Sequence, residues 1–167
     1  MGLSSTDGTL AISLTNAAAI VGSIFVGFLS DRYHVTTAIM VSCVGTVMAV
    51  FLFWSFAVYK SLFFLFALFY GFFAGGYSST WASAAKPLRE KGYPGTETGM
   101  VIAIFSAAKG IGAVISGPLS ESLVAADSWK GKAGFAFGSG YGGTLIFTGV
   151  TAAFTSVAWG GRRYGYL

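Results

Sequence analysis

The chain alternates long apolar runs with short polar segments. Each run reaches the roughly 17 to 25 residues that a helix needs to cross the hydrocarbon core of a bilayer. The polar segments are too short to hold a soluble domain. The pattern predicts an all-α membrane protein, in which a single polytopic bundle over residues 1–167 has five spans, at 9–29, 37–58, 62–84, 100–124 and 142–159.

Composition supports a membrane location. Hydrophobic residues make up 54% of the chain and charged residues only 10%, whereas globular proteins carry about 25% charged residues. The 24 glycines are also typical of membrane helices, whose backbones approach one another closely. Basic residues are spread over separate loops, which argues against nucleic-acid binding. The partner expected from the composition is membrane lipid.

The polar segments indicate how the chain turns. Lys60 sits in a segment so short that the second and third spans should be antiparallel neighbours. Pro87 and Pro94 bracket a charged run, so residues 85–99 are expected to form a solvated loop.

The asymmetry of basic residues predicts the orientation. Cytoplasmic loops carry an excess of Lys and Arg, so the richer side should be cytoplasmic, with the N-terminus outside and the C-terminus inside a plasma or organelle membrane. The richer side holds six basic residues and the other side three: Arg32, Lys86, Arg89, Lys91, Arg162 and Arg163 against Lys60, Lys130 and Lys132.

One motif lies at the cytoplasmic end of the first span. Gly27, Asp31 and Arg32 form the pattern G-x-x-x-D-R. The glycine permits close packing, and the two charges can pair with neighbouring helix ends. We therefore interpret the three residues as a conformational latch, with an ordinary charged helix end as the alternative.

The third span combines small and aromatic residues. Gly71 and Gly75 form a G-x-x-x-G pattern that predicts a helix-packing face. Tyr77 and Trp81 share a helical stripe with Tyr70 and Ala74. These aromatic side chains either line a substrate path or form the bundle core.

Lys109 is the most informative residue because it lies about three residues from the middle of its span. A lysine at such depth costs about 2.5–3.5 kcal/mol on insertion scales. It shares a face with Ser106 and other small residues, which favours a water-filled cavity over snorkelling or structural pairing. A cation there suits an anionic carboxylate. The candidate substrate-binding residues are therefore Lys109, Ser106, Tyr77, Trp81 and Asn16, although Asn16 could instead bond between helices.

The sequence lacks the residues for a disulfide, a metal site or an enzyme active site. Cys43 is the single cysteine and His34 the single histidine, so neither a disulfide nor a Cys/His metal site can form. No nucleophile has a paired base, and no glycine-rich loop could cradle a phosphate. We expect no enzyme activity, no metal and no cofactor.

Three segments resemble a known family. The G-x-x-x-D-R motif, F-Y-G-F-F-A-G-G at 69–76 and F-S-A-A-K-G-I-G-A-V-I-S-G-P at 105–118 are similar to the last five helices of fungal monocarboxylate-transporter-like permeases of the major facilitator superfamily. His34 and Val35 depart from the rest of that loop signature. Ala19 and Ser23 replace the acidic and basic pair of animal relatives, so their proton coupling is not transferable.

The resemblance implies a transporter of a small organic anion, such as a monocarboxylate, working by alternating access. Relatives often carry arginine where this chain has Lys109. Five helices correspond to part of one transporter half, so a complementary half or self-association is expected to complete the pathway. The alternative is a non-transporting membrane structural or interaction protein, or the product of a truncated transporter gene.

Overall fold

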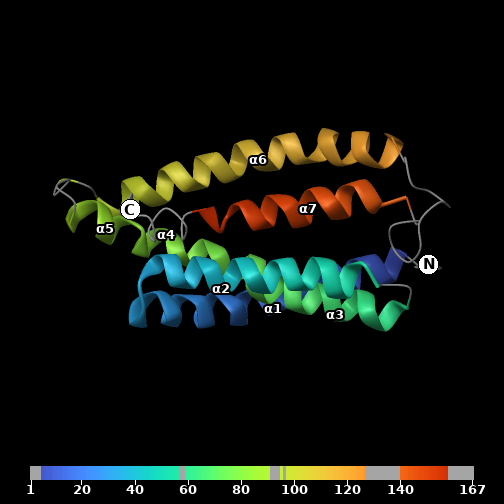
Figure 1. Cartoon of the computed structure of the whole chain (residues 1–167), viewed down its shortest axis with the longest axis horizontal. Helices are drawn as coiled ribbons and strands as arrows, with labels where there is room; N and C mark the ends of the chain where they lie inside the picture. The colour runs from blue at the N-terminus through green and yellow to red at the C-terminus, as the bar shows by residue number, and fades with distance from the viewer. Residues whose placement is uncertain (1–4, 57–58, 91–94, 96, 127–139, 158–167) are drawn as a thin grey trace.

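The computed structural model describes residues 5–56, 59–90, 95, 97–126 and 140–157. Long helices run side by side and reverse direction from one to the next, and α6 and α7 lie along one side of the group formed by α1, α2 and α3 (Figure 1). No strand occurs among these residues. The all-α fold expected from the apolar runs is confirmed.

Four helical stretches are long and apolar enough to cross a membrane. They are α1 (Ser5–Arg32), α2 (Val35–Met48) with its π-helical continuation η1 (Ala49–Trp54), the stretch Lys60–Glu90, and α6 (Thr98–Ala126). At about 1.5 Å per residue, the 28 residues of α1 extend about 42 Å, more than the roughly 30 Å of hydrocarbon.

The stretch Lys60–Glu90 changes its winding along its length. It begins as α3 (Lys60–Tyr70) and continues as a π-helical segment η2 (Gly71–Gly75) and a 3₁₀ turn η3 (Gly76–Ser79). It ends with α4 (Thr80–Ser83) and α5 (Ala85–Glu90). The glycines in the middle have no Cβ to favour one helical winding over another.

The loop predicted over residues 85–99 is wrong for residues 85–90, which form α5, and for residues 98–99, which begin α6. Pro87 is the third residue of α5, and proline is tolerated in the first turn of a helix, where no intrahelical N–H bond is lost. Pro87 therefore marks where one helical segment gives way to the next, and the helical structure itself continues to Glu90. Pro94, the second proline that brackets the charged run, lies outside the described residues.

The last apolar run forms α7 (Gly142–Phe154), whose 13 residues are fewer than a bilayer-spanning helix needs. The amides of Thr155 and Ser156 bond to carbonyls three residues earlier, at 3.2 and 3.0 Å. Such bonds tighten a last turn and close a helix. Residues 158–159, which the sequence assigns to this span, lie outside the described part of the chain.

Contact between α1 and residues 71–76, called here the glycine-rich segment, holds the first three spans together. The buried residues of α1 form one stripe that includes Ala18, Gly22 and Val26. A methyl group on Gly71 would overlap the backbone of Thr15, and one on Gly75 would overlap Ala19. The packing face predicted from the G-x-x-x-G pattern is confirmed.

Aromatic side chains fill the space on the other side of α3. The rings of Trp54 and Phe66 lie 5.0 Å apart between centroids, and those of Phe53 and Phe69 lie 4.8 Å apart. Trp54 and Phe66 pack against fully buried Leu145, which brings α7 onto η1 and α3. The predicted antiparallel pairing of the second and third spans is seen here (Figure 1).

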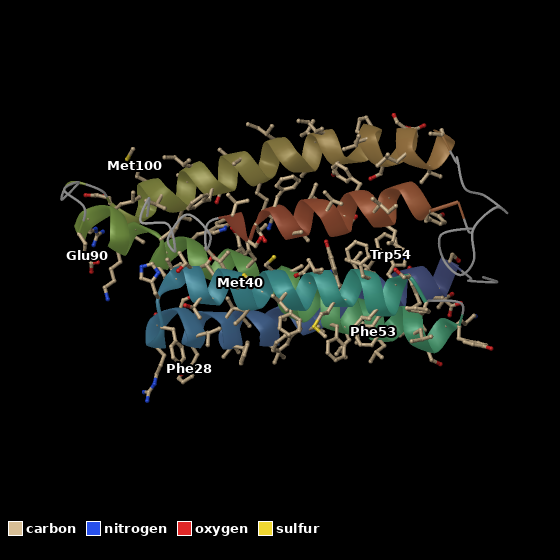
Figure 2. The ribbon with its side chains drawn as sticks, viewed as in Figure 1. Phe28, Met40, Phe53, Trp54, Glu90 and Met100 are labelled. Atoms are coloured by element: carbon tan, nitrogen blue, oxygen red, sulfur yellow. The ribbon has the colours of Figure 1, made fainter. Side chains whose placement is uncertain are left out.

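Large apolar side chains cover the outside of the bundle. Phe28 on α1 and Met100 on α6 point away from the other helices (Figure 2), and their exposed fractions are 63% and 62%. Apolar surface on this scale is unfavourable in water, whereas lipid chains satisfy it. The chain is an integral, multi-pass membrane protein.

We predict that Gly71→Ala weakens the packing of α1. The added methyl group meets backbone atoms of Thr15, which cannot move aside by a rotamer change, so the free energy of unfolding should fall by about 1–3 kcal/mol. Unfolding in detergent micelles measures the change. Gly112→Ala on α6 is the control, because no atom lies within 4 Å of its new methyl group. Equal stability of both variants would contradict this packing.

Candidate functional site

Lys109 lies near the middle of α6, on a helix that makes few contacts with the rest of the bundle. Val101 is the single buried residue of α6. Toward the bundle, Lys109 faces α4, and its ammonium nitrogen Nζ lies 5.8 Å from the centroid of the Trp81 ring. This distance is within the roughly 6 Å of a cation–π interaction.

A cavity of about 390 Å³ separates α6 from the glycine-rich part of the third span. Tyr77 and Trp81, four residues apart, line one wall, and Phe105 and Lys109, also four residues apart, line the opposite wall. Residues at this spacing share a helix face. Gly75, Ala74, Ser78 and Ala108 complete the lining.

Three aromatic side chains and one charged side chain line this cavity, together with small residues. The Trp81 and Phe105 rings lie 6.0 Å apart between centroids. No carboxylate is among the residues that line the cavity. Glu121, on the same helix as Lys109, is twelve residues further along, or about 18 Å at 1.5 Å per residue. The cavity therefore offers a cation without a neighbouring anion.

Three of the five residues singled out for substrate binding meet here. Lys109, Tyr77 and Trp81 line the same cavity. Asn16 is exposed on α1, and Ser106 is exposed on α6, and neither lines it. The lysine therefore pairs with the aromatic stripe of the third span rather than with the serine stripe of its own helix.

Sequence reasoning missed Phe105 and Ser78 as neighbours of Lys109. Phe105 could have been found, because it precedes Lys109 by one helical turn and so shares its face. Ser78 follows a change of helical winding. A regular period of 3.6 residues gives no signal for its position.

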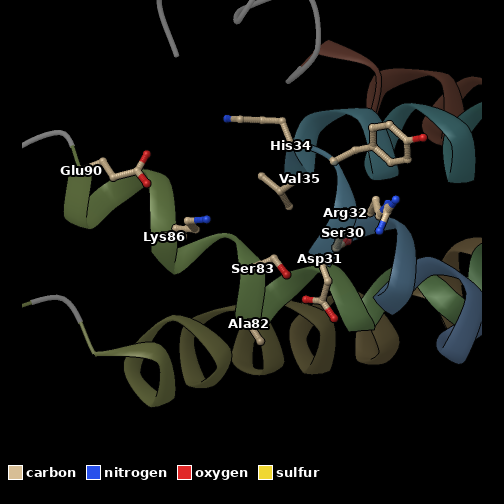
Figure 3. Close-up of a pocket in the computed structure, with 10 residues that line it drawn as sticks. Ser30, Asp31, Arg32, His34, Val35, Ala82, Ser83, Lys86 and Glu90 are labelled. Atoms are coloured by element: carbon tan, nitrogen blue, oxygen red, sulfur yellow. The ribbon is translucent and has the colours of Figure 1, made fainter.

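The three residues that the sequence predicts as a latch lie at one end of the bundle. Asp31 and Arg32 line a second cavity, of about 550 Å³, between the α1–α2 turn and the helices α4 and α5. Figure 3 shows Lys86 and Glu90 across from that turn. Among the described residues, neither Asp31 nor Arg32 has a charged partner within salt-bridge distance.

Gly27 does not approach its neighbours as closely as expected. A methyl group there would meet only the Cβ of Ser79, at 3.9 Å, an ordinary van der Waals contact. The close approach of α1 occurs instead at Gly22, where a methyl group would overlap the Phe72 carbonyl.

Comparison with known proteins gives one family match. A family model described as Major Facilitator Superfamily matches residues 1–161. No curated protein and no solved structure matches the chain. Within the described residues, no group of His, Cys, Asp or Glu side chains is placed to hold a metal ion.

Proposed function

Because this chain belongs to the major facilitator superfamily, a family of membrane transporters, we propose that it moves a small organic anion, such as a monocarboxylate, by alternating access. The observation that carries the proposal is the Lys109 ammonium, which borders a cavity lined by no carboxylate. In the low dielectric of a membrane interior such a cation strongly attracts an anion. The resemblance to fungal monocarboxylate-transporter-like permeases supports the same substrate class.

Four residues of the cavity have distinct parts in this proposal. Lys109 holds the substrate carboxylate as a point charge, without the bidentate fork that an arginine would offer. Its contact with Trp81 keeps the ammonium at the cavity without neutralising it. Trp81 and Phe105 provide apolar walls for the hydrocarbon part, and the Tyr77 hydroxyl is a hydrogen-bond donor beside them.

Asp31 and Arg32 act as the latch in this proposal. They lie at the edge of the membrane, and their cavity separates the α1–α2 turn from α4 and α5. Charges that are unpaired in one conformation can pair when such a cavity closes. The latch therefore controls the rate of conformational change and does not touch the substrate.

The exposed face of α6 supports the proposal that further helices complete the pathway. The transporter folds of this type pair two sets of helices around a midplane site. Since Val101 is the single buried residue of α6, a complementary half or a second copy of this chain can cover the rest of that helix. The same exposed face of α6 also suits the alternative, a membrane structural or interaction protein that does not transport.

Uptake measurements separate the two functions. The chain is reconstituted in proteoliposomes alone, and then joined to a complementary half from a relative, with radiolabelled short-chain monocarboxylates as substrates. Uptake in either preparation that stops with Lys109→Gln supports transport by this chain. Uptake in neither preparation supports the structural alternative.

We predict that Lys109→Gln abolishes binding of monocarboxylates while the protein still inserts and folds. The neutral amide is less costly in the membrane than an ammonium, and no ion pair is broken. Lys109→Arg should keep partial binding, because the charge remains while the donor geometry changes. Equilibrium dialysis in detergent measures the binding. Ser106→Ala is the matched control and should bind normally, and parental transport by Lys109→Leu would contradict the assignment.

We predict that Asp31→Asn slows turnover with little change in substrate affinity. Asp31 lies in the last turn of α1 and lines a different cavity from Lys109. Turnover and half-saturation constant are measured from initial uptake rates. A large loss of affinity with unchanged turnover would instead assign Asp31 to substrate binding.

We predict a cytoplasmic location for the end of the bundle that carries Arg32, Lys86 and Arg89. In a Cys43→Ser background, Ser5→Cys should react with an impermeant maleimide from outside. Glu97→Cys should react only after the membrane is permeabilised. Reaction of both cysteines from the same side contradicts the proposed topology.

A further inference from the structure

The cavity beside Lys109, called here the Lys109 cavity, has a largely apolar lining around a single cation. Its volume of about 390 Å³ lies within the roughly 300–1,000 Å³ typical of small-molecule pockets. Lys109 is the one charged residue among the described residues that line it. The other polar side chains of the lining are the hydroxyl-bearing Tyr77 and Ser78. A matching ligand therefore carries one negative charge on an apolar body.

The lining limits which anions fit. A second carboxylate would have no cation beside it, and an unpaired charge is costly in a membrane interior. Extra hydroxyl groups on the ligand find few partners, because the Ser78 hydroxyl already donates to the Gly75 carbonyl at 3.4 Å. A polar group that is buried without a partner also costs free energy. Dicarboxylates and polyhydroxy acids are therefore disfavoured.

Three aromatic rings from two helices border the same space. Tyr77 and Trp81 come from the third span, and Phe105 comes from α6. The rings of Trp81 and Phe105 have centroids 6.0 Å apart and planes tilted by 35°, so they form one continuous wall between the two helices. Aromatic rings favour offset or edge-to-face contact with one another at centroid distances of about 4.5–7 Å. A flat ring in the cavity can make such contacts with both helices.

Lys109 lies at the edge of this aromatic wall. Its Nζ atom is 5.8 Å from the centroid of the Trp81 ring. Phe105 precedes it by four residues on α6, a spacing at which side chains share a helix face. A carboxylate that pairs with the ammonium is thereby placed beside both rings. The body attached to that carboxylate then extends along the wall.

We propose that the Lys109 cavity selects aromatic monocarboxylates, such as benzoate, over saturated acids of similar size. This inference rests on the proposed function, because it takes Lys109 as the carboxylate site. The substrate ring packs against Tyr77, Trp81 and Phe105. Contacts between aromatic rings add free energy beyond the burial of apolar area. Cyclohexanecarboxylate buries a similar area but cannot make these contacts.

A third cavity, of about 270 Å³, adjoins the first and lies between α2, the glycine-rich segment and α7. Residues with hydroxyl groups form part of its lining, so it is called here the hydroxyl cavity. They include Ser42 and Thr46 on α2, Tyr70 and Tyr77 on the third span, and Thr148 and Thr151 on α7. None of the described residues that line it is charged. A carboxylate there would have no cation, although Tyr77 lines both cavities.

Equilibrium dialysis of the full chain in detergent micelles, with radiolabelled benzoate, measures the preference. Unlabelled acids compete with the label, and protein-free micelles give the background. We expect cyclohexanecarboxylate to compete about two- to tenfold more weakly than benzoate, the difference that contacts between aromatic rings give. Propionate should compete about tenfold or more weakly than benzoate, because it buries less apolar surface. Lys109→Gln should abolish binding of all three acids.

Phe105→Leu removes one ring and keeps an apolar side chain. It should reduce the preference for benzoate over cyclohexanecarboxylate by about half or more, whereas propionate should compete as it does in the parent. A folding defect would weaken all three acids equally. Phe28→Leu is the matched control, since this side chain on α1 is 63% exposed. Thr151→Val is the control in the hydroxyl cavity, and both controls should keep the parental preference.

The outcomes separate this inference from the proposed function. Equal competition by benzoate and cyclohexanecarboxylate in the parent would overturn the aromatic preference and leave anion transport standing. Loss of the preference in Thr151→Val, with Phe105→Leu unchanged, would place the ring in the hydroxyl cavity and overturn the inference. Absence of binding by every acid, or benzoate binding that survives Lys109→Gln, would overturn the inference together with the carboxylate site on which it rests.

Discussion

The close approach of α1 to the backbone of the third span is the interaction on which the other contacts depend. In lipid the hydrophobic effect does not draw helices together, so association relies on van der Waals contact between small residues. Gly22, Gly71 and Gly75 supply that contact, because a side chain at any of them would overlap the opposite helix. With one face fixed in this way, the third span presents its aromatic residues to α6 and α7.

That arrangement gives the interior two chemically different cavities on neighbouring faces of one helix. On the α6 side, a single cation faces aromatic walls, and the low dielectric strengthens its attraction for an anion. On the α7 side, residues with hydroxyl groups from three helices line a space without charge. Tyr77 borders both, so occupants of the two cavities would contact the same ring.

The helices and the glycine packing face follow from the sequence, because hydrophobic length and small-residue spacing are local signals. The sequence does not predict helix α5 (Ala85–Glu90), because a proline beside a charged run is typical of a loop, whereas proline also fits a first helical turn. Lys109 is predicted from its depth in the span and from the small and polar residues on its face, and Trp81 from a helical stripe, but the sequence gives no signal that the two side chains meet. The hydroxyl cavity was not predictable, because Ser42 and Thr148 lie on helices far apart in the chain, and only packing brings them together.

The change of winding in the third span also sets the aim of its side chains. A π-helical turn holds more residues than an α-helical turn, and a 3₁₀ turn holds fewer, whereas each residue of a regular α-helix rotates the chain by about 100°. Deleting one residue from η2 would therefore rotate α4 about the helix axis and shift it along that axis. The Trp81 ring would move away from Lys109, and Gly75 would lose its place against Ala19. The winding of η2 therefore sets both how the third span packs on α1, because η2 holds Gly75 against Ala19, and which way the Trp81 ring faces.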